Sequence, residues 1–402
     1  MREWRRVSLG DVAVKIGSGA TPRGGSSVYI DSGVAFIRSQ NVHDSRFVSD
    51  GLVHIDDLAA SALDGVAVGA GDVLLNITGD SVARCCLAPG TVPLARVNQH
   101  VMIVRPDPRA LNSRYLQALL VEPRMKSRLL ALAGAGATRP ALTKAHIAGL
   151  QLDLPSLPEQ RAIAEVLGAL DDKIEANRRV SRLLEEHLAL AFAESRFDQP
   201  ADESIPLAKI VEVGPVRPKP AGDGVPYIDM ATLPTDSALI ASMQARPPKS
   251  GTRFVNGDTL MARITPCLEN GKVAYVDCLG DDQTGVGSTE FIVLRPREPL
   301  PSQFSYFLAR SERFSTYAVR HMSGSSGRQR CPVEAVERYD IARPDSADLA
   351  KFAALAGPSF AAMRGALNES LILATLRDTL LPKLLSGELQ VRDPESLVAQ
   401  AV

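Results

Sequence analysis

The stretch Leu154 to Asn177, LPSLPEQRAIAEVLGALDDKIEAN, predicts a long helix in the middle of the chain. Pro158 suits the first helical turn, where a missing N–H costs nothing, and Glu159 favours the positive end of the helix dipole. Apolar residues then recur at a 3-4 spacing, which places one seam against a partner helix. The expected seam residues are Ile163, Leu167, Leu170, Ile174, Leu184 and Leu188. A helix from 158 to about 195 would be about 57 Å long at about 1.5 Å per residue.

A second stripe over residues 346–381 predicts the partner helix. Its seam residues are Leu349, Phe352, Ala356, Phe360, Met363, Leu367, Leu371 and Ala374. Gly357-Pro358 should kink or interrupt its first turns, because proline removes one backbone hydrogen bond and clashes with the preceding turn. We expect the two helices to pack antiparallel.

Asn177 falls at the middle of the first seam, opposite Leu367 or Asn368. A polar residue in such a seam fixes the register of the two helices at some loss of stability. The alternative is that Asn177 points to solvent at the edge of the seam.

Length and composition restrict the class of protein. A chain of 402 residues is too long for one compact core and suits two domains. No run of eighteen apolar residues could cross a bilayer, and the N-terminus lacks the apolar part of a secretory signal, so we expect a cytoplasmic protein. The five cysteines show no CxxC spacing, so neither a disulfide framework nor a zinc site is indicated.

The charge balance argues against a uniformly basic nucleic-acid binder. The net charge is −1, and residues 1–157 hold 17 Lys+Arg against 13 Asp+Glu, whereas residues 198–345 hold 17 against 19. Any contact with DNA must therefore be local or shared with a partner.

The two halves of the chain resemble each other in the same order. GDVLLNIT at 71–78 reappears as GDTLMARIT at 257–265, and VMIVRP at 101–106 reappears as FIVLRP at 291–296. Several such matches in one order predict a duplicated domain. Because the strands and helices show no strict alternation, we expect an α+β fold, with two duplicated mixed domains joined by two long antiparallel, coiled-coil-like helices.

This organisation divides the chain into five segments. We expect the two duplicated domains at 1–155 and 198–345. The first long helix occupies 156–197, the second helix with a C-terminal motif occupies 346–391, and a tail occupies 392–402.

The helix motifs resemble a known family. LPSLPEQRAIAEVLGALDDKIEANRR and, near the end, LRDTLLPKLLSGELQV (376–391) are similar to the two conserved regions of type I restriction-modification specificity subunits. WRRVSLGD at 4–11 and GATP at 19–22 also resemble the usual start of the first recognition domain. The stretch PDSADLAKFAALAGPSF (344–360) departs from the family's usual helix start, which puts symmetric docking on that side in doubt.

The resemblance implies a non-catalytic subunit that binds double-stranded DNA. Each recognition domain would read one half of a bipartite target, and the helices would set the spacing between the two halves like a ruler. The helices would also dock two modification (methyltransferase) subunits, and a restriction subunit would complete an ATP-dependent nuclease for phage defence.

The residues themselves indicate no active site. The chain has neither an NPPY-like tetrapeptide nor a glycine-rich cofactor turn, and its six histidines show no HExxH or paired spacing. We therefore expect no cofactor, no metal and no catalytic residue. Two other readings stay open, namely a fused restriction-methylation enzyme and an assembly scaffold that reads no sequence.

Base-reading candidates are side chains in loops that pair with base edges. Arginine contacts guanine through two hydrogen bonds, and asparagine or glutamine contacts adenine. For each candidate the alternative is a solvated or structural polar residue. In the first domain they are Arg23, Arg38, Gln40, Asn41, Arg84, Asn98, Gln99, Thr138, Arg139 and Lys144, and in the second Arg263, Lys272, Arg328, Gln329 and Arg330.

Overall fold

The computed structural model divides the chain into two compact units. Unit 1 comprises Met1–Ile174 and Ile372–Val402, and unit 2 comprises Glu175–Leu371. The structure describes residues 4–92, 94–135, 140–199, 204–220, 222, 224–247, 250–325 and 327–391. Each unit is described by itself.

Unit 1 is built on an antiparallel four-stranded sheet. Its strand order is β2 (Ala13–Ser18), β10 (Val101–Pro106), β7 (Val73–Asn76) and β8 (Cys85–Leu87). Both faces of the sheet are covered. Alternate residues of one strand point to opposite faces, so they belong to two different cores. Val73 and Leu75 belong to the core beneath helices α2 (Ser113–Val121) and α3 (Pro123–Gly134), whereas Leu74 belongs to the core beneath a smaller sheet.

The smaller sheet has the order β6 (Val53–Ile55), β3 (Val34–Ile37) and β9 (Arg96–Val97), with β3 and β9 parallel. The remaining elements of this unit are β1 (Arg5–Ser8) paired with β11 (Gln151–Leu154), β4 (Val42–His43) paired with β5 (Arg46–Phe47), α1 (Asp57–Ser61), α4 (Lys144–Ala148), and the short 3-10 helices η1 (Leu9–Val12), η2 (Gly25–Val28), η3 (Ser39–Asn41) and η4 (Asp64–Val66).

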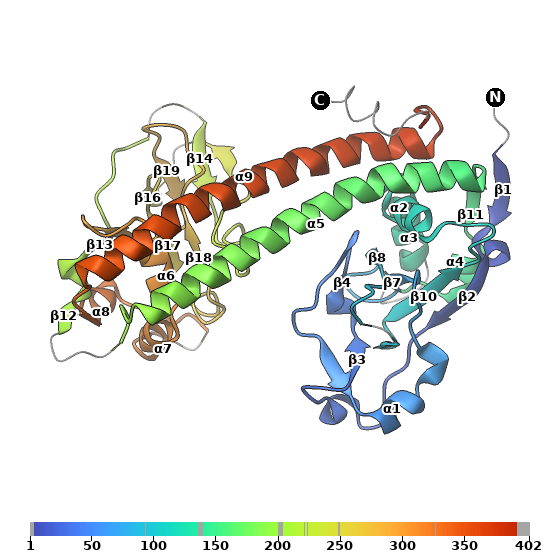
Figure 1. Cartoon of the computed structure of the whole chain (residues 1–402), viewed down its shortest axis with the longest axis horizontal. Coiled ribbons are helices and arrows are strands. Elements are labelled where there is room, and N and C mark those ends of the chain that lie inside the picture. The colour runs from blue at the N-terminus through green and yellow to red at the C-terminus, as the bar shows by residue number, and fades with distance from the viewer. Residues whose placement is uncertain are drawn as a thin grey trace. The chain divides into compact units, whose positions relative to one another are not determined.

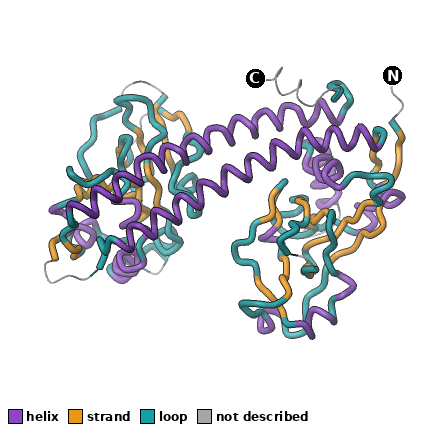
Figure 2. The backbone as a smooth tube through the Cα atoms, in the orientation of Figure 1, coloured by secondary structure: helices purple, strands orange, loops and turns teal. Residues whose placement is uncertain are grey.

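Unit 2 repeats this arrangement, so the predicted duplication is confirmed (Figures 1 and 2). Its main sheet has the order β13 (Val211–Val213), β20 (Phe291–Pro296), β17 (Thr259–Ala262) and β18 (Val273–Tyr275). Its second sheet has the order β15 (Gln244–Arg246), β14 (Val225–Ile228), β19 (Gly285–Gly287) and β16 (Thr252–Phe254), with β14 and β19 parallel. The other elements are β12 (Ser204–Pro206) paired with β21 (Asp340–Ala342), η5 (Leu207–Lys209), α6 (Phe304–Arg310), α7 (Glu312–Arg320) and α8 (Val333–Glu337).

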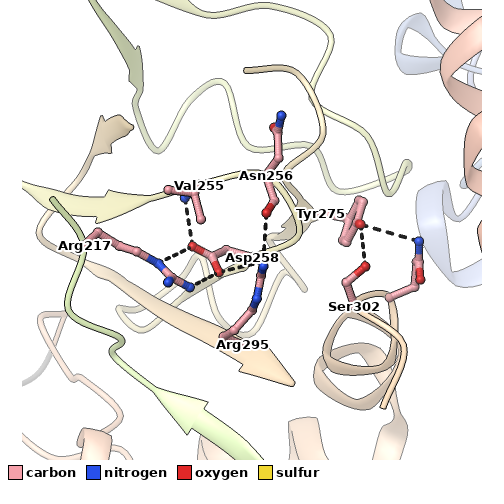
Figure 3. A network of polar contacts seen from close by, with 8 residues as sticks. Arg217, Val255, Asn256, Asp258, Tyr275, Arg295 and Ser302 are labelled. Carbon is pink, nitrogen blue, oxygen red and sulfur yellow. Dashed lines mark hydrogen bonds and ion pairs between the residues drawn. The ribbon is translucent and has the colours of Figure 1, made fainter. Parts of the chain in front are cut away.

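A buried ion pair recurs at the start of the same strand in both units. Asp72 and Asp258 are fully buried, and each accepts hydrogen bonds from an arginine of the neighbouring strand, Arg105 at 2.6 and 2.8 Å and Arg295 at 3.3 Å. Figure 3 shows Arg217 as a second guanidinium directed at Asp258, with its Nε 3.0 Å from Oδ2. Burial raises the pKa of Asp258, and hydrogen bonds from Arg217 oppose that shift.

The two long helices are α5 (Leu157–Glu194) and α9 (Ser346–Leu385). Within unit 2, Asn177 donates to Glu369 Oε2 at 2.6 Å, and the rings of Phe192 and Phe352 lie 5.6 Å apart. Residue numbers rise along α5 while they fall along α9, so the helices are antiparallel, as predicted.

Within unit 1, Arg377 of α9 donates to Asp171 of α5 at 2.8 Å. Leu380 and Leu384 belong to the same core as Ile163 and Leu167.

Most predicted seam residues are buried. Below 9% exposure are Ile163, Leu167, Leu170, Ile174, Asn177, Leu188, Leu349, Phe352, Ala356, Phe360 and Met363, while Leu184, Leu367 and Ala374 are half-buried. Leu371 is the exception, because it is 44% exposed and Ser370 is buried in its place. The seam steps three residues from Leu367 rather than four, so the prediction for Leu371 was wrong.

Two further details differ from the prediction. Asn177 does lie in the seam, but it meets the Ala366 carbonyl (3.3 Å) and Glu369 rather than Leu367 or Asn368. Helix α9 also continues through Gly357 and Pro358 without interruption. Both residues are exposed, so the carbonyl that loses its partner at Pro358 can bind water. Among the helices of the described residues, none has the length and apolar character needed to cross a bilayer.

Candidate nucleic-acid interface

In unit 1, loops that are far apart in the sequence meet where β7 leaves the main sheet. Asn76, the last residue of β7, is buried and donates to the Ser39 carbonyl at 2.9 Å and to Ser81 Oγ at 3.1 Å. It therefore joins η3 to the turn that follows β7.

Backbone hydrogen bonds bring two more segments to this place. The Ile77 N–H donates to the His100 carbonyl at 2.9 Å, and the Leu142 N–H donates to the Ile77 carbonyl at 2.8 Å. We call segments 38–41, 77–84, 98–100 and 140–144 the loop cluster of unit 1. All four segments therefore lie at the same end of the sheet.

A chain of polar side chains runs across the cluster. Thr21 donates to the Gln99 amide oxygen, Gln99 Nε2 lies 2.9 Å from His100 Nε2, and His100 Nδ1 lies 2.6 Å from Thr78 Oγ1. The segment with Thr21 can lie this close because Gly19 has no side chain, since a Cβ there would be 2.1 Å from the Val97 carbonyl oxygen. The cluster thus presents amide, imidazole and hydroxyl groups together.

The structure separates the candidates of the first domain into two groups. Arg23, Gln40, Gln99 and Lys144 are exposed, and Arg38 and Arg84 are half-buried. Asn41 and Asn98 are buried, and their side chains hold the loops themselves. Burial thus distinguishes Asn41 and Asn98 from the other candidates, and Thr138 and Arg139 lie outside the described residues.

The buried amides satisfy backbone groups. Asn41 Oδ1 accepts from the Arg38 N–H at 3.0 Å, and Asn98 Oδ1 accepts from the His100 N–H at 3.1 Å. Arg38 is also engaged, because its Nη2 donates to the Gly51 carbonyl at 2.6 Å. These residues shape the cluster rather than extend from it.

Unit 2 forms the equivalent cluster. The Arg263 N–H donates to the Glu290 carbonyl at 3.0 Å, and the Cys331 N–H donates to the Arg263 carbonyl at 2.8 Å. We call segments 229–232, 263–272, 288–290 and 323–331, with the placement of residue 326 left aside, the loop cluster of unit 2. Lys272 joins two of these segments, because its Nζ donates to the Met230 carbonyl at 2.6 Å.

Arg330 forms a two-bond ion pair in this cluster. Its Nε lies 2.9 Å from Glu290 Oε2 and its Nη2 lies 2.6 Å from Oε1. The hydrogen bonds from Arg330 lower the pKa of Glu290, so the carboxylate is charged at neutral pH. Arg328 is exposed beside it, and Gln329 and Arg263 are half-buried.

The two clusters share a framework but not their side chains. His100 and Glu290 occupy equivalent positions, because each backbone carbonyl accepts from the residue that follows the strand, Ile77 or Arg263. Ala141 and Arg330 are likewise equivalent, since they form matching bridges to Thr78 and Ile264. Neither His100 nor Glu290 was among the sequence candidates, although extending the repeat by a few residues would have aligned them.

The chemistry of these clusters suits recognition. Guanidinium and amide groups provide the hydrogen-bond donors and acceptors that match base edges. Within the described residues, no group of three or more His, Cys, Asp or Glu is arranged to hold a metal ion.

Comparisons with known proteins find a family model that matches the first part of the chain. Residues 1–186 match the family model described as the type I restriction modification DNA specificity domain. This part of the chain is similar to type I restriction-modification specificity subunits.

Individual relatives are similar in sequence, and a solved structure is similar in fold. The HindI specificity subunit of Haemophilus influenzae is 26% identical over 249 residues, which cover 61% of this chain and 48% of that protein. The EcoEI specificity subunit of Escherichia coli is 35% identical over 104 residues, which cover 26% and 17%. The chain thus spans about half or less of the length of these relatives. The S subunit structure from M. genitalium shares the fold, with a TM-score of 0.57, 14% identity and coverage of 95% and 96%.

Proposed function

We propose that the chain is the DNA-specificity subunit of a type I restriction-modification enzyme and reads a bipartite duplex target. The observation that carries this proposal is the pair of loop clusters, which have the same framework and different side chains at equivalent positions. Two readers of this kind would recognise two different half-sites. A protein that only assembled its partners would need no such difference.

The base readers that we propose are Arg23, which lies two residues after Thr21, and the exposed or half-buried candidates of the two clusters. In unit 1 they are Arg23, Gln40, Arg84, Gln99 and Lys144, with His100 added, and in unit 2 they are Arg263, Arg328, Gln329 and Arg330. Arg38 and Lys272 are assigned to loop geometry, because both donate to backbone carbonyls.

We further propose that residues 1–155 and 198–345 are the recognition domains and that α5 and α9 set the spacing between the half-sites. The helices and the C-terminal motif to residue 391 would dock two modification subunits, and a restriction subunit would join them. These partners would supply both the chemistry and part of the phosphate contact, which suits a net charge of −1. The protein would work in the cytoplasm, and the chain itself would be non-catalytic.

The test is selection of DNA by the 402-residue chain from a library of random duplexes. The enriched duplex should contain two short fixed motifs separated by positions without preference. At fixed salt its affinity should exceed that of a scrambled duplex by at least about a thousandfold. Equal affinity for the two duplexes would favour a scaffold, and methyl transfer by the isolated chain would favour a fused enzyme.

A further inference from the structure

The Arg330 guanidinium is fixed on one edge and open on another. Its Nε and Nη2 donate to the two oxygens of Glu290 at 2.9 and 2.6 Å, and its Nη1 lies 3.4 Å from the Arg328 carbonyl. The side chain nevertheless remains 42% exposed. Since each terminal nitrogen carries two N–H groups, Nη1 and Nη2 each keep one that these contacts do not use.

Those remaining donors form the end of the planar guanidinium. Two parallel donors at this spacing match the O6 and N7 acceptors of guanine, which the major groove exposes as a pair. The Glu290 carboxylate already holds the Nε–Nη2 edge, so the long Arg330 side chain would lose less rotamer freedom on binding DNA. Glu290 also offsets one of the nearby positive charges, Arg263 and Arg330, so the contact would depend on geometry more than on net charge.

We propose that Arg330 reads one guanine in the half-site of unit 2 through O6 and N7, and that Glu290 is its positioning residue. This inference rests on the proposed function and names one specificity determinant within it. Unit 1 has Ala141 and His100 at the equivalent positions, so its half-site is recognised without this contact.

The test is a double-mutant cycle that measures the affinity of each protein variant for duplexes with single base replacements. The duplex selected by the wild-type chain is synthesised with each guanine replaced in turn by 7-deazaguanine, which lacks the N7 acceptor. For wild type, one guanine in one half-site should show a loss of about tenfold in affinity. Arg330→Ala should weaken binding of the unmodified duplex by about 5- to 150-fold, as expected for a lost bidentate contact. In that variant the same 7-deazaguanine should have an effect below about twofold, because its partner is gone.

Two conservative variants separate positioning from folding. Arg330→Lys keeps the charge but not the paired donors, so it should retain affinity for scrambled DNA and lose the preference for guanine. Glu290→Gln should show the same relaxed preference at that position, and thermal melting should show that both variants are folded.

Arg109→Ala is the matched control. Arg109 pairs with Asp107 in the same two-bond geometry, at 3.0 and 2.8 Å. It comes after the last residue of β10, whereas the unit 1 cluster lies at the first residue of that strand. Its removal should leave the sensitivity to every 7-deazaguanine unchanged.

The outcomes separate this inference from the proposed function. If a two-part motif is selected but Arg330→Ala stays as sensitive as wild type to 7-deazaguanine at every position, the assignment of Arg330 is wrong while the function stands. If no motif is selected, the proposed function fails and this inference fails with it.

Discussion

Lengthening both long helices by one heptad should lengthen the DNA spacer that the protein prefers. The insertions belong between residues 174 and 175 of α5 and between residues 371 and 372 of α9, where the two units divide. At these places they leave the contacts inside each unit unchanged. Arg377 keeps Asp171 in unit 1, and Asn177 keeps Glu369 in unit 2.

The size of the effect follows from helix geometry. Seven residues at about 1.5 Å each add about 10.5 Å to each helix. At about 3.4 Å of duplex per base pair, the spacer should grow by about three base pairs. A heptad is the suitable unit because it departs from two full turns by only about 20°, so the apolar seam still faces its partner.

Selection from a random duplex library measures the result directly. Both half-site motifs should be those of the wild-type chain, and only the number of unread positions between them should rise. Insertion into α5 alone is the control, because it moves the seam out of register on one side and should lower the melting temperature. An unchanged spacer in a stable protein with both insertions would refute the role of α5 and α9 in setting the spacing.

Three further predictions concern stability and reactivity. Phe192→Ala removes a buried ring that packs against four others, so it should lower the free energy of unfolding of unit 2 by about 3–5 kcal/mol in thermal melts. Leu190→Ala is the control, because Leu190 is 64% exposed, and it should change that free energy by less than about 0.5 kcal/mol. Asp258→Ala should destabilise by about 3–5 kcal/mol in urea titrations, because two guanidinium groups lose their counter-charge, and a change below about 1 kcal/mol would contradict this. Cys85 and Cys86 should resist alkylation by iodoacetamide at mildly alkaline pH until the protein unfolds. Burial raises the pKa of both thiols, that of Cys86 to about 12, so little reactive thiolate is present. Labelling of either cysteine in the native chain, detected by mass spectrometry, would contradict this.

The duplication and the helices could be predicted from sequence because they rest on periodic burial. The Gly-Asp turn before β7 and β17 is visible as a motif, and the 3-4 stripe of α5 follows the period of the helix. The exact register could not be predicted. A helix with 3.6 residues per turn drifts against a strict heptad, so Ser370 takes the position expected for Leu371.

The candidate site was harder to predict because the same side chain can serve two purposes. An amide that satisfies a backbone group inside a loop and an amide that reads a base look alike in sequence. Asn41 is fully buried while Gln40 beside it is exposed, and only the fold separates them. His100 and Glu290 were missed for a related reason, since their equivalence depends on backbone hydrogen bonds rather than on residue type.

The positions that differ between the two units are those at which a change has little effect on folding. Removing Arg105 would leave the fully buried Asp72 carboxylate without this partner and should destabilise the protein by about 3–5 kcal/mol, a large part of the roughly 5–15 kcal/mol by which a domain is stable. His100 and Glu290 are half-exposed, and the hydrogen bonds that place them come from the backbone, which every residue type but proline can supply in full. A substitution at such a surface position should change the free energy of unfolding by about 1 kcal/mol or less, even where it removes the exposed Glu290–Arg330 ion pair. The framework can therefore stay fixed while the side chains that we propose as base readers diverge, which would let two copies of one domain read different half-sites.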